Sequence, residues 1–336
     1  MIIVTGGAGF IGSALIWKLN RLGRRDILVV DRLGTGDKWR NLVPLAFDDF
    51  VDKADFQARS ADGLPAACEV VFHMGACSST TERDADYLIR NNTRTTVELA
   101  RTCKRQGIPF IYASSAATYG DGSQGYDDDP ATVETLEPLN GYGWSKQLAD
   151  RWIAREGLLA HATGFRFFNV FGPNEYHKGD MRSMVLKAWQ QVRAGERVKL
   201  FANHREGFRD GDESRDFVYV KDVVDTLVAA WQQPGTPGLY NLGTGTARSF
   251  RDLVLAVYSA LGLPPDIDWV PMPESLRGQY QYYTCATTER GRAAGLPPAT
   301  TSLEEAVRDY VCNYLEAGQA RLGASAAGSP VRVTMT

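Results

Sequence analysis

The 336-residue sequence lacks the features that are typical of exported, membrane-spanning or metal-binding proteins. Its five cysteines are an odd number without a C-x-x-C pair, which indicates free thiols in a reducing compartment. No apolar run reaches the roughly 18 residues of a membrane helix, and the first residues lack a basic region followed by a long apolar one. We therefore expect a cytoplasmic protein with no membrane partner and no metal.

The charge composition excludes a further class of partner. Lys and Arg number 37, Asp and Glu number 40, and the formal net charge is -3. The two signs are mixed along the chain, so no basic field is present that could neutralise a nucleic-acid backbone. We expect no nucleic-acid partner.

What is present is an alternation of short apolar runs with amphipathic segments. The expected strands are Ile2 to Thr5, Ile27 to Asp31, Val70 to Met74, Phe110 to Ser114 and Thr163 to Phe168. Runs that are apolar on both sides and separated by helical periods are typical of a parallel sheet covered on both faces. The sequence predicts the α/β class, with a doubly wound parallel-sheet Rossmann domain and a smaller mixed α/β substrate lobe.

The regular alternation breaks after Phe168. Residues 218–231 are predicted to form a helix and residues 239–242 a strand that re-enters the first domain. We expect a dinucleotide-binding domain from residues 1–170 plus about 217–242, and a substrate lobe from about 171–216 and 243–316. The tail, residues 318–336, is rich in small residues without periodicity, and we expect it to be disordered.

A glycine-rich turn follows the first expected strand. Gly6, Gly9 and Gly12 are spaced G-x-x-G-x-x-G and open a predicted helix. Missing side chains let the backbone approach a pyrophosphate, whose charge the N–H groups at the helix N-terminus can hold. A turn packed for steric reasons alone is the less favoured alternative, because strand, turn and helix are all in place.

The residues at the end of the second expected strand leave the choice of dinucleotide open. Asp31 could accept hydrogen bonds from the adenosine ribose hydroxyls and favour NAD. Arg32, Lys38 and Lys53 could instead pair with the 2′-phosphate of NADP, although each could equally be a solvated surface cation.

Tyr142 and Lys146 form the candidate chemical pair. Four residues apart on a predicted helix, their side chains project from one side. A phenol needs preferential stabilisation of its anion to act as a base near neutral pH, and a nearby ammonium and a nicotinamide can supply it. Ser115, at the end of a strand, is the candidate third catalytic residue, because its hydroxyl can hydrogen-bond the reacting oxygen. The alternative is that Ser115 only caps the end of a strand or helix.

These motifs resemble the extended short-chain dehydrogenase/reductase superfamily, and more closely the ADP-L-glycero-D-manno-heptose 6-epimerase family of lipopolysaccharide core synthesis. The resemblance covers roughly residues 1 to 316. It rests on residues 1–13, 75–81, 113–120, 176–179 and 215–220. It implies inversion at C6 of ADP-D-glycero-D-manno-heptose through a transient 6-keto sugar, with tightly held NADP favoured over NAD, in a homo-oligomer for which a pentamer is one form.

The resemblance also implies residue roles. Tyr142 is the acid/base, Lys178 a second one, and Lys146 and Ser115 complete the catalytic set. The expected cofactor contacts are Gly6, Gly9, Phe10, Ile11, Gly12, Asp31, Arg32, Lys38, Lys53, Met74, Gly75, Ala76, Cys77, Ser78, Asn91, Lys146 and Val170. The expected substrate contacts are Asn169, Asp180, Lys187, Phe201, Arg215 and Tyr280. The sequence departs from the family pattern at Met74, Asp180 and Lys187 and in a longer loop before Arg215.

Lys178 has a mechanistic reason for this role. Inverting a carbinol through a ketone requires the sugar to present two orientations to one nicotinamide, so two proton-handling groups are useful. Taken alone, Lys178 would be a solvated lysine.

Two alternatives to this function stay open. One is a 4-epimerase of another sugar nucleotide, and the other is a non-catalytic dinucleotide-sensing protein. Dehydration is disfavoured because alanines, Ala116 and Ala117, follow Ser115 where that chemistry needs a carboxylate pair.

Overall fold

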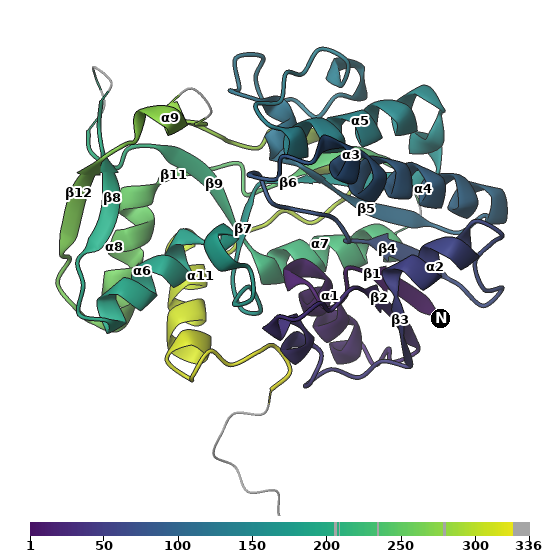
Figure 1. Ribbon diagram of the computed structural model, residues 1–336, viewed down its shortest axis with the longest axis horizontal. Coiled ribbons are helices and arrows are strands. Elements are labelled where there is room, and N and C mark those ends of the chain that lie inside the picture. Colours follow the sequence, from purple (N-terminus) through teal and green to yellow (C-terminus); the bar gives the residue numbers. More distant parts are fainter. Residues whose placement is uncertain (205–206, 208, 234, 278–279, 325–336) are drawn as a thin grey trace, which may run out of the picture.

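The computed structural model describes residues 1–324 apart from 205, 206, 208, 234, 278 and 279 (Figure 1). Its main feature is a seven-stranded sheet in the order β10-β6-β5-β4-β1-β2-β3, parallel throughout. The strands are β1 (Ile2–Thr5), β2 (Ile27–Asp31), β3 (Asp49–Asp52), β4 (Val70–His73), β5 (Phe110–Ser115), β6 (Ala162–Phe167) and β10 (Gly238–Leu242). The predicted doubly wound Rossmann architecture is confirmed.

Helices cover both faces of this sheet because its strands are apolar on both sides. Ile2 and Val4 pack into one buried cluster, and Ile3 between them packs into the opposite one. The first cluster includes α1 (Phe10–Arg21) and α7 (Val220–Gln232), which pack against each other and lie side by side in Figure 1. The opposite face carries α2 (Lys53–Ser60), α4 (Thr95–Gln106) and α5 (Gly141–Arg155), with α3 (Ala85–Leu88) nearby. We call the seven-stranded sheet with these helices the first lobe.

A second lobe is built from two small sheets. One is mixed, in the order β11-β9-β7, from β11 (Ala247–Ser249), β9 (Ser214–Tyr219) and β7 (Asn169–Phe171). The other is a parallel pair, β8 (Val198–Ala202) and β12 (Ile267–Pro271). The accompanying helices are α6 (Met184–Arg193), α8 (Phe250–Leu261), α9 (Glu274–Arg277) and α11 (Leu303–Tyr310), while α10 (Glu289–Ala293) packs against β10 of the first lobe. The predicted smaller mixed α/β lobe is confirmed, while the residue boundaries between the lobes remain a prediction.

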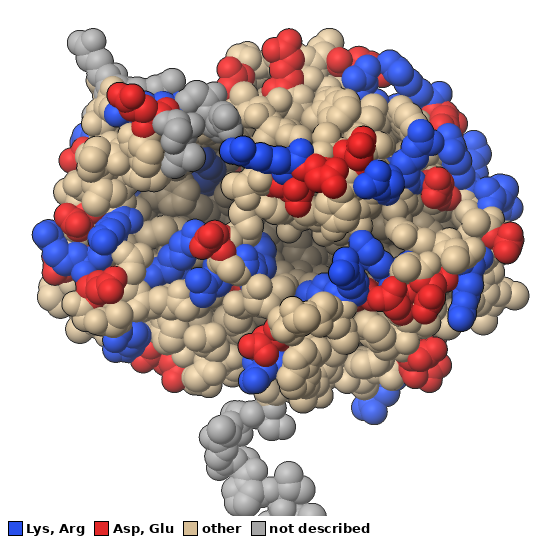
Figure 2. Space-filling model, in the orientation of Figure 1, with Lys and Arg blue, Asp and Glu red and all other residues tan. Residues whose placement is uncertain are grey.

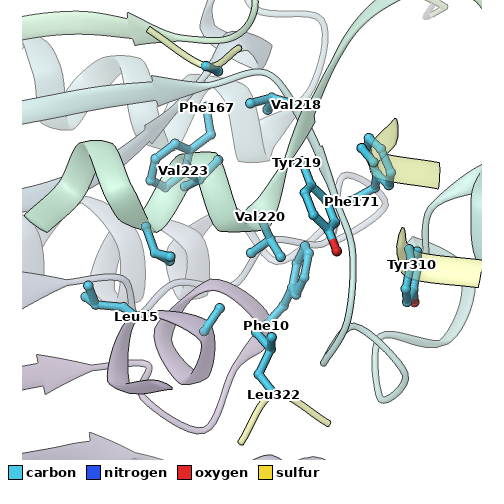
Figure 3. Close-up of a cluster of buried hydrophobic side chains, with 14 of the residues drawn as sticks. Phe10, Leu15, Phe167, Phe171, Val218, Tyr219, Val220, Val223, Tyr310 and Leu322 are labelled. Atoms are coloured by element: carbon cyan, nitrogen blue, oxygen red, sulfur yellow. The ribbon is translucent and has the colours of Figure 1, made fainter. Parts of the chain in front are cut away.

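The buried cluster of α1 and α7 extends toward the second lobe. Figure 3 shows Phe10, Val220, Tyr219, Phe171 and Leu322 in one continuous group, which joins the start of α1 to β7, β9 and the C-terminal segment. The start of α1 therefore lies at the junction of the two lobes.

Two expectations about local structure were wrong, and one strand of the large sheet was not predicted. That strand is β3, whose four residues include charged Asp49 and Asp52 and form no apolar run. Val218 and Tyr219 were predicted to be helical but end β9, since this apolar β-branched run also suits a buried strand. Within the tail predicted to be disordered, residues 319–322 pack against the protein, with Leu322 1% exposed, while residues 318, 323 and 324 are exposed. Residues 325–336 of the predicted tail lie outside the described residues.

Within the described part of the chain, no helix combines the length and apolar character needed to cross a membrane.

Candidate active site

The glycine turn lies between β1 and α1 and is closed against the end of β4. Gly6 has φ +66°, and a Cβ there would lie 2.6 Å from the backbone nitrogen of Gly75. A Cβ on Gly12 would lie 2.2 Å from the carbonyl oxygen of Gly6. Both positions therefore require glycine. Gly9 precedes α1 and has no side chain to cap its first N–H groups, which suits an anionic ligand.

Asp31 ends β2 and is bonded directly to this turn. Its carboxylate accepts hydrogen bonds from the N–H of Ala8 at 2.9 Å and from its neighbour Arg32 at 2.7 Å. The ammonium of Lys38 lies 2.7 Å from the same group, and Asp31 is 8% exposed. The carboxylate thus fixes the turn while remaining beside the expected ribose position.

A cavity of about 170 Å³ opens beside Asp31, and many of the expected cofactor residues line it. Those residues are Gly6, Asp31, Arg32, Lys38, Lys53, Gly75, Ala76 and Asn91. The ammonium of Lys53 donates to Asn91 Oδ1 at 2.5 Å. Burial lowers the pKa of Lys53, and the charges of Arg32 and Lys38 lower it further against the opposing effect of Asp31 and Asp52. Three cations gathered in this way would be stabilised by an added anion.

The candidate chemical pair lies on α5 beside the end of β5. The Ser115 side chain lies close enough to Tyr142 to lower the pKa of the phenol, and its Oγ also accepts the N–H of Ala117 at 3.1 Å. Ser115 is therefore both a capping serine and a partner of the phenol. Lys146 is 2% exposed, and its ammonium donates to the carbonyl oxygen of Ala113 at 2.8 Å. The four-residue spacing places both side chains toward the carboxyl end of β5.

Burial controls the protonation of both groups. It lowers the pKa of Lys146 to about 8, against the opposing effect of Asp150 and the Cys77 thiol. It raises the pKa of Tyr142 above its usual value, and the Ser115 side chain only partly offsets this. The protein chain by itself thus keeps the phenol protonated. A lowering of its pKa by Lys146 together with a nicotinamide stays a prediction.

A buried asparagine that the sequence reasoning missed connects the cofactor segment to α5. Asn92 Oδ1 accepts the N–H of Cys77 at 2.8 Å, and its Nδ2 donates to the carbonyl of Cys77 at 3.0 Å. The same Nδ2 lies 2.9 Å from Ser145 Oγ, one residue before Lys146. The only signal in the sequence is the pair Asn91-Asn92 within a helical segment, here a π-helical turn over Ile89–Arg94.

Lys178 lies in the loop after β7, against the first lobe. Its ammonium is 5.1 Å from the centre of the Phe10 ring, at the first residue of α1. Burial lowers the pKa of Lys178, the charge of Lys187 adds to this effect, and Glu175 opposes it. Lys187 in turn donates to the backbone oxygen of Asp180 at 2.7 Å. Lys178, Lys187 and Asp180 therefore lie near one another, with Lys178 beside the first residue of α1, and the structure shows no hydrogen bond between the described side chains of Lys178 and Tyr142.

Arg215, Tyr280 and Phe201 are brought together in the second lobe. The Arg215 guanidinium lies 5.1 Å from the centre of the Tyr280 ring and 5.5 Å from that of Phe250, and Phe201 meets Tyr280 edge to face at 6.0 Å. Arg215 is 6% exposed, and burial lowers its pKa although Tyr280 raises it. Phe250 was missed, because a phenylalanine that begins a helix gives no functional signal.

The remaining predicted residues are placed less distinctively. Met74 packs against the buried core and is absent from the cavity lining. Ser78 and Asn169 are exposed, while Ile11 and Val170 are half-buried. Their roles stay predictions. On the face seen in Figure 2, Lys and Arg side chains border a hollow near the middle of the molecule.

A parallel sheet of this order, with a glycine turn after its first strand and a Tyr-x-x-x-Lys helix beside its fifth, defines the dinucleotide-dependent short-chain dehydrogenase/reductase class. A family model described as "NAD dependent epimerase/dehydratase family" matches residues 2–243, and the chain belongs to this family.

Relatives and solved structures agree with this assignment. The chain is 52% identical over 318 residues to a protein of Nitratidesulfovibrio vulgaris (strain DP4) named ADP-L-glycero-D-manno-heptose-6-epimerase, covering 94% of this chain and 98% of that protein. The Helicobacter pylori enzyme of the same name has a crystal structure that matches with TM-score 0.76 and 27% identity, covering 93% and 95% of the two chains. A Thermus thermophilus UDP-glucose 4-epimerase in complex with NAD matches with TM-score 0.72 and 27% identity, covering 92% and 97%.

Proposed function

We propose that the protein is an isomerase that inverts C6 of the heptose in ADP-D-glycero-D-manno-heptose to give ADP-L-glycero-D-manno-heptose. The reaction passes through a transient 6-keto sugar and belongs to the synthesis of lipopolysaccharide core precursors. The observation that carries the proposal is the placement of Tyr142 and Lys146 on α5 beside Ser115 at the carboxyl end of β5, where Lys146 donates to Ala113. It occurs in a chain 52% identical over nearly its full length to a relative of that name.

The residues of this chain supply the proton transfer and the orientation. The phenolate of Tyr142 takes the proton of the C6 carbinol during oxidation, and the phenol formed in this way returns a proton to the carbonyl oxygen during reduction. Ser115 donates to the same oxygen, and Lys146, held by Ala113, would orient the ribose and stabilise the phenolate. A nicotinamide dinucleotide held by these residues would supply the hydride acceptor for the oxidation and the hydride donor for the reduction.

Lys178 is proposed as the proton-handling group for the second orientation of the sugar. Its lowered pKa makes its neutral form more accessible than that of a solvated lysine. Lys178 lies beside Phe10, the first residue of α1, at the junction of the two lobes. A sugar nucleotide would lie at this junction. Arg215 and Tyr280 are proposed to hold the nucleotide from the second lobe.

The residues fit a dinucleotide, and we propose NADP as the physiological one. A side chain at Gly6 would fill the space where the backbone of the turn approaches Gly75. Arg32, Lys38 and Lys53 gather at one end of the cavity, where a 2′-phosphate would reduce their mutual repulsion. Replacing Lys53 with methionine should weaken NADP binding about tenfold, the loss of one charged hydrogen bond, and leave NAD binding unchanged in a fluorescence titration.

We also propose that the enzyme acts in the cytoplasm as a homo-oligomer, with a pentamer as one form to be tested by light scattering.

The function is tested with purified protein and no added cofactor. Each ADP-heptose epimer should be converted into the other, and denaturation should release one dinucleotide, which chromatography identifies as NADP or NAD. UDP-glucose serves as the control substrate, because a 4-epimerase would act on it instead. A protein that binds the dinucleotide but converts neither sugar would contradict the proposal and favour a sensing role.

A further inference from the structure

A group of buried amides joins the glycine turn to the loop that carries Lys178. Asn41, 1% exposed, donates through Nδ2 to the carbonyl oxygen of Ala8 at 3.1 Å and to that of Asn174 at 3.0 Å. Because Asp31 already binds the N–H of Ala8, the residue is held by its N–H and its carbonyl together. The orientation of the turn therefore depends on Asn41 as well as on Asp31.

Asn174 makes the second half of this connection. It is completely buried with φ +80°, a conformation rare for residues other than glycine. Its Nδ2 donates to Ser13 Oγ at 3.0 Å in the first turn of α1. Four residues later in the same loop, Lys178 lies over the ring of Phe10. A buried, hydrogen-bonded amide in a rare backbone conformation indicates that the loop is held against α1.

The C-terminal segment is hydrogen-bonded to both asparagines and to the loop that carries Lys178. Leu322 donates its N–H to Asn174 Oδ1 at 3.0 Å, and Arg321 Nε donates to Asn41 Oδ1 at 3.2 Å. The Tyr176 hydroxyl, in the Lys178 loop, donates to the carbonyl of Ala320 at 2.7 Å. Figure 1 shows this segment running from the end of α11 toward α1, and Figure 3 places Leu322 beside Phe10.

We propose that residues 320–323, which we name the C-terminal clamp, act through Asn41 and Asn174 as positioning residues that keep the dinucleotide seated between turnovers and hold Lys178 in place. The inference rests on the proposed function. In an epimerase, the dinucleotide that receives the hydride must also return it. If the reduced dinucleotide left before this second step, the keto sugar could not be reduced and turnover would stop. Through Asn41 and Asn174 the clamp holds the peptide of Ala8 and the first turn of α1, whose N–H groups would hold a pyrophosphate.

The clamp is tested by the rate at which NADPH leaves the protein. Stripped full-length protein and variants are loaded with NADPH, and release into excess NADP is followed by fluorescence. A chain ending at Gln319 lacks the clamp, whereas a chain ending at Ala324 keeps it. Asn174→Gly tolerates the positive φ and removes only the two amide bonds.

Release should become about tenfold faster in the chain ending at Gln319 and in Asn174→Gly, as expected for the loss of one or two hydrogen bonds. The chain ending at Ala324 should release NADPH at the full-length rate. If the chain ending at Gln319 does not fold, Asn174→Gly decides the question alone.

The variant Asn20→Ala is the control for faster release caused by a general loss of stability. Asn20 makes three comparable amide bonds, to Arg24 and Ala46, near the opposite end of α1. This variant should lower the melting temperature without faster release. Equal release from Asn174→Gly and Asn20→Ala, or unchanged release from the clamp variants, would overturn the proposal. Because no sugar is present, failure to convert ADP-heptose would count against the proposed function and not against the clamp.

Discussion

The two lobes present their candidate ligand groups in different ways. In the first lobe, the glycine turn, Asp31, Ala76 and Ser115 all lie at or just after the carboxyl ends of strands in one parallel sheet. In the second lobe, Arg215 comes from β9, while its aromatic neighbour Tyr280 follows α9 far along the chain. The first arrangement follows from the sheet order, as in other doubly wound folds. The second depends on how two small sheets pack.

The difference extends to the kind of contact. Asp31 and Lys146 are buried and bonded to the backbone of the first lobe, whereas in the second lobe Arg215 is equally buried but lies over the Tyr280 ring, which Phe201 meets edge to face. We infer that substitutions in the first lobe affect chemistry and stability, while those in the second mainly affect substrate affinity. The predictions below test this contrast.

The largest expected effect is that of Tyr142→Phe. Removing the hydroxyl removes the group that handles the carbinol proton, and turnover should fall by about a thousandfold. NADPH retention and melting temperature should stay the same, since the ring is kept. Tyr258→Phe, which deletes a buried hydroxyl bonded to Asp266 in the second lobe, is the matched control and should retain turnover. Substantial activity in Tyr142→Phe would show that another residue carries the proton.

Gly6→Ala should combine loss of the dinucleotide with loss of stability. The new methyl group would overlap the backbone of Gly75 in addition to the strain of its positive φ, at a cost of about 3 kcal/mol in the free energy of unfolding. Gly107→Ala isolates the strain, because Gly107 has φ +68° but no atom within 4 Å of its added Cβ. Its cost should be about 1 kcal/mol. Similar urea unfolding curves for the two variants would mean that close approach at the turn is unimportant.

Arg215→Met tests the second lobe. It keeps an apolar stem against Tyr280 and Phe250 but removes the charge, so the KM for the ADP-sugar should rise about 10- to 100-fold with a smaller change in kcat. The control is Arg248→Met, the residue opposite Arg215 in the β9–β11 pairing, whose guanidinium binds Asp252 and Glu304 instead. A fall in kcat with unchanged KM would mean that Arg215 acts in the chemical step. It would contradict the inference that second-lobe residues mainly affect substrate affinity.

The last prediction concerns the effect of pH on the stability contributed by His73. Its ring bonds Thr5 Oγ1 at 2.7 Å and Thr96 Oγ1 at 3.0 Å, and burial lowers its pKa to about 3 from an ordinary 6.5. Below pH 6.5 the unfolded chain binds a proton that the folded chain does not. The contribution of His73 to stability is therefore complete above pH 6.5 and is lost as the pH falls toward 3, by about 1.4 kcal/mol per pH unit. In urea titrations between pH 6 and 4, the free energy of unfolding of His73→Gln should change less with pH than that of the unchanged protein. An identical slope for the two proteins would mean that the folded protein protonates His73 readily.

Much of the first lobe could be predicted because its signals are local. The strand over residues 2–5 and the glycines that follow it lie within a dozen residues, and the spacing of Tyr142 and Lys146 is one helical turn. Lys178 and Arg215 depended on family resemblance, since neither has a local pattern that separates it from a surface or core cation. Asn92 and Asn41 were missed, because an asparagine becomes informative only when its partners are known.

The sequence by itself therefore determined the parallel sheet, the glycine turn and the tyrosine–lysine helix, since periodicity and turn chemistry act over a few neighbouring residues. Only the tertiary structure decided that Asp31 and Lys38 are paired, that Arg215 meets Tyr280, and that residues 320–323 reach Asn41 and Asn174. These contacts join segments whose proximity follows from packing of the two lobes and from hydrogen bonds that buried amides must find somewhere in the fold.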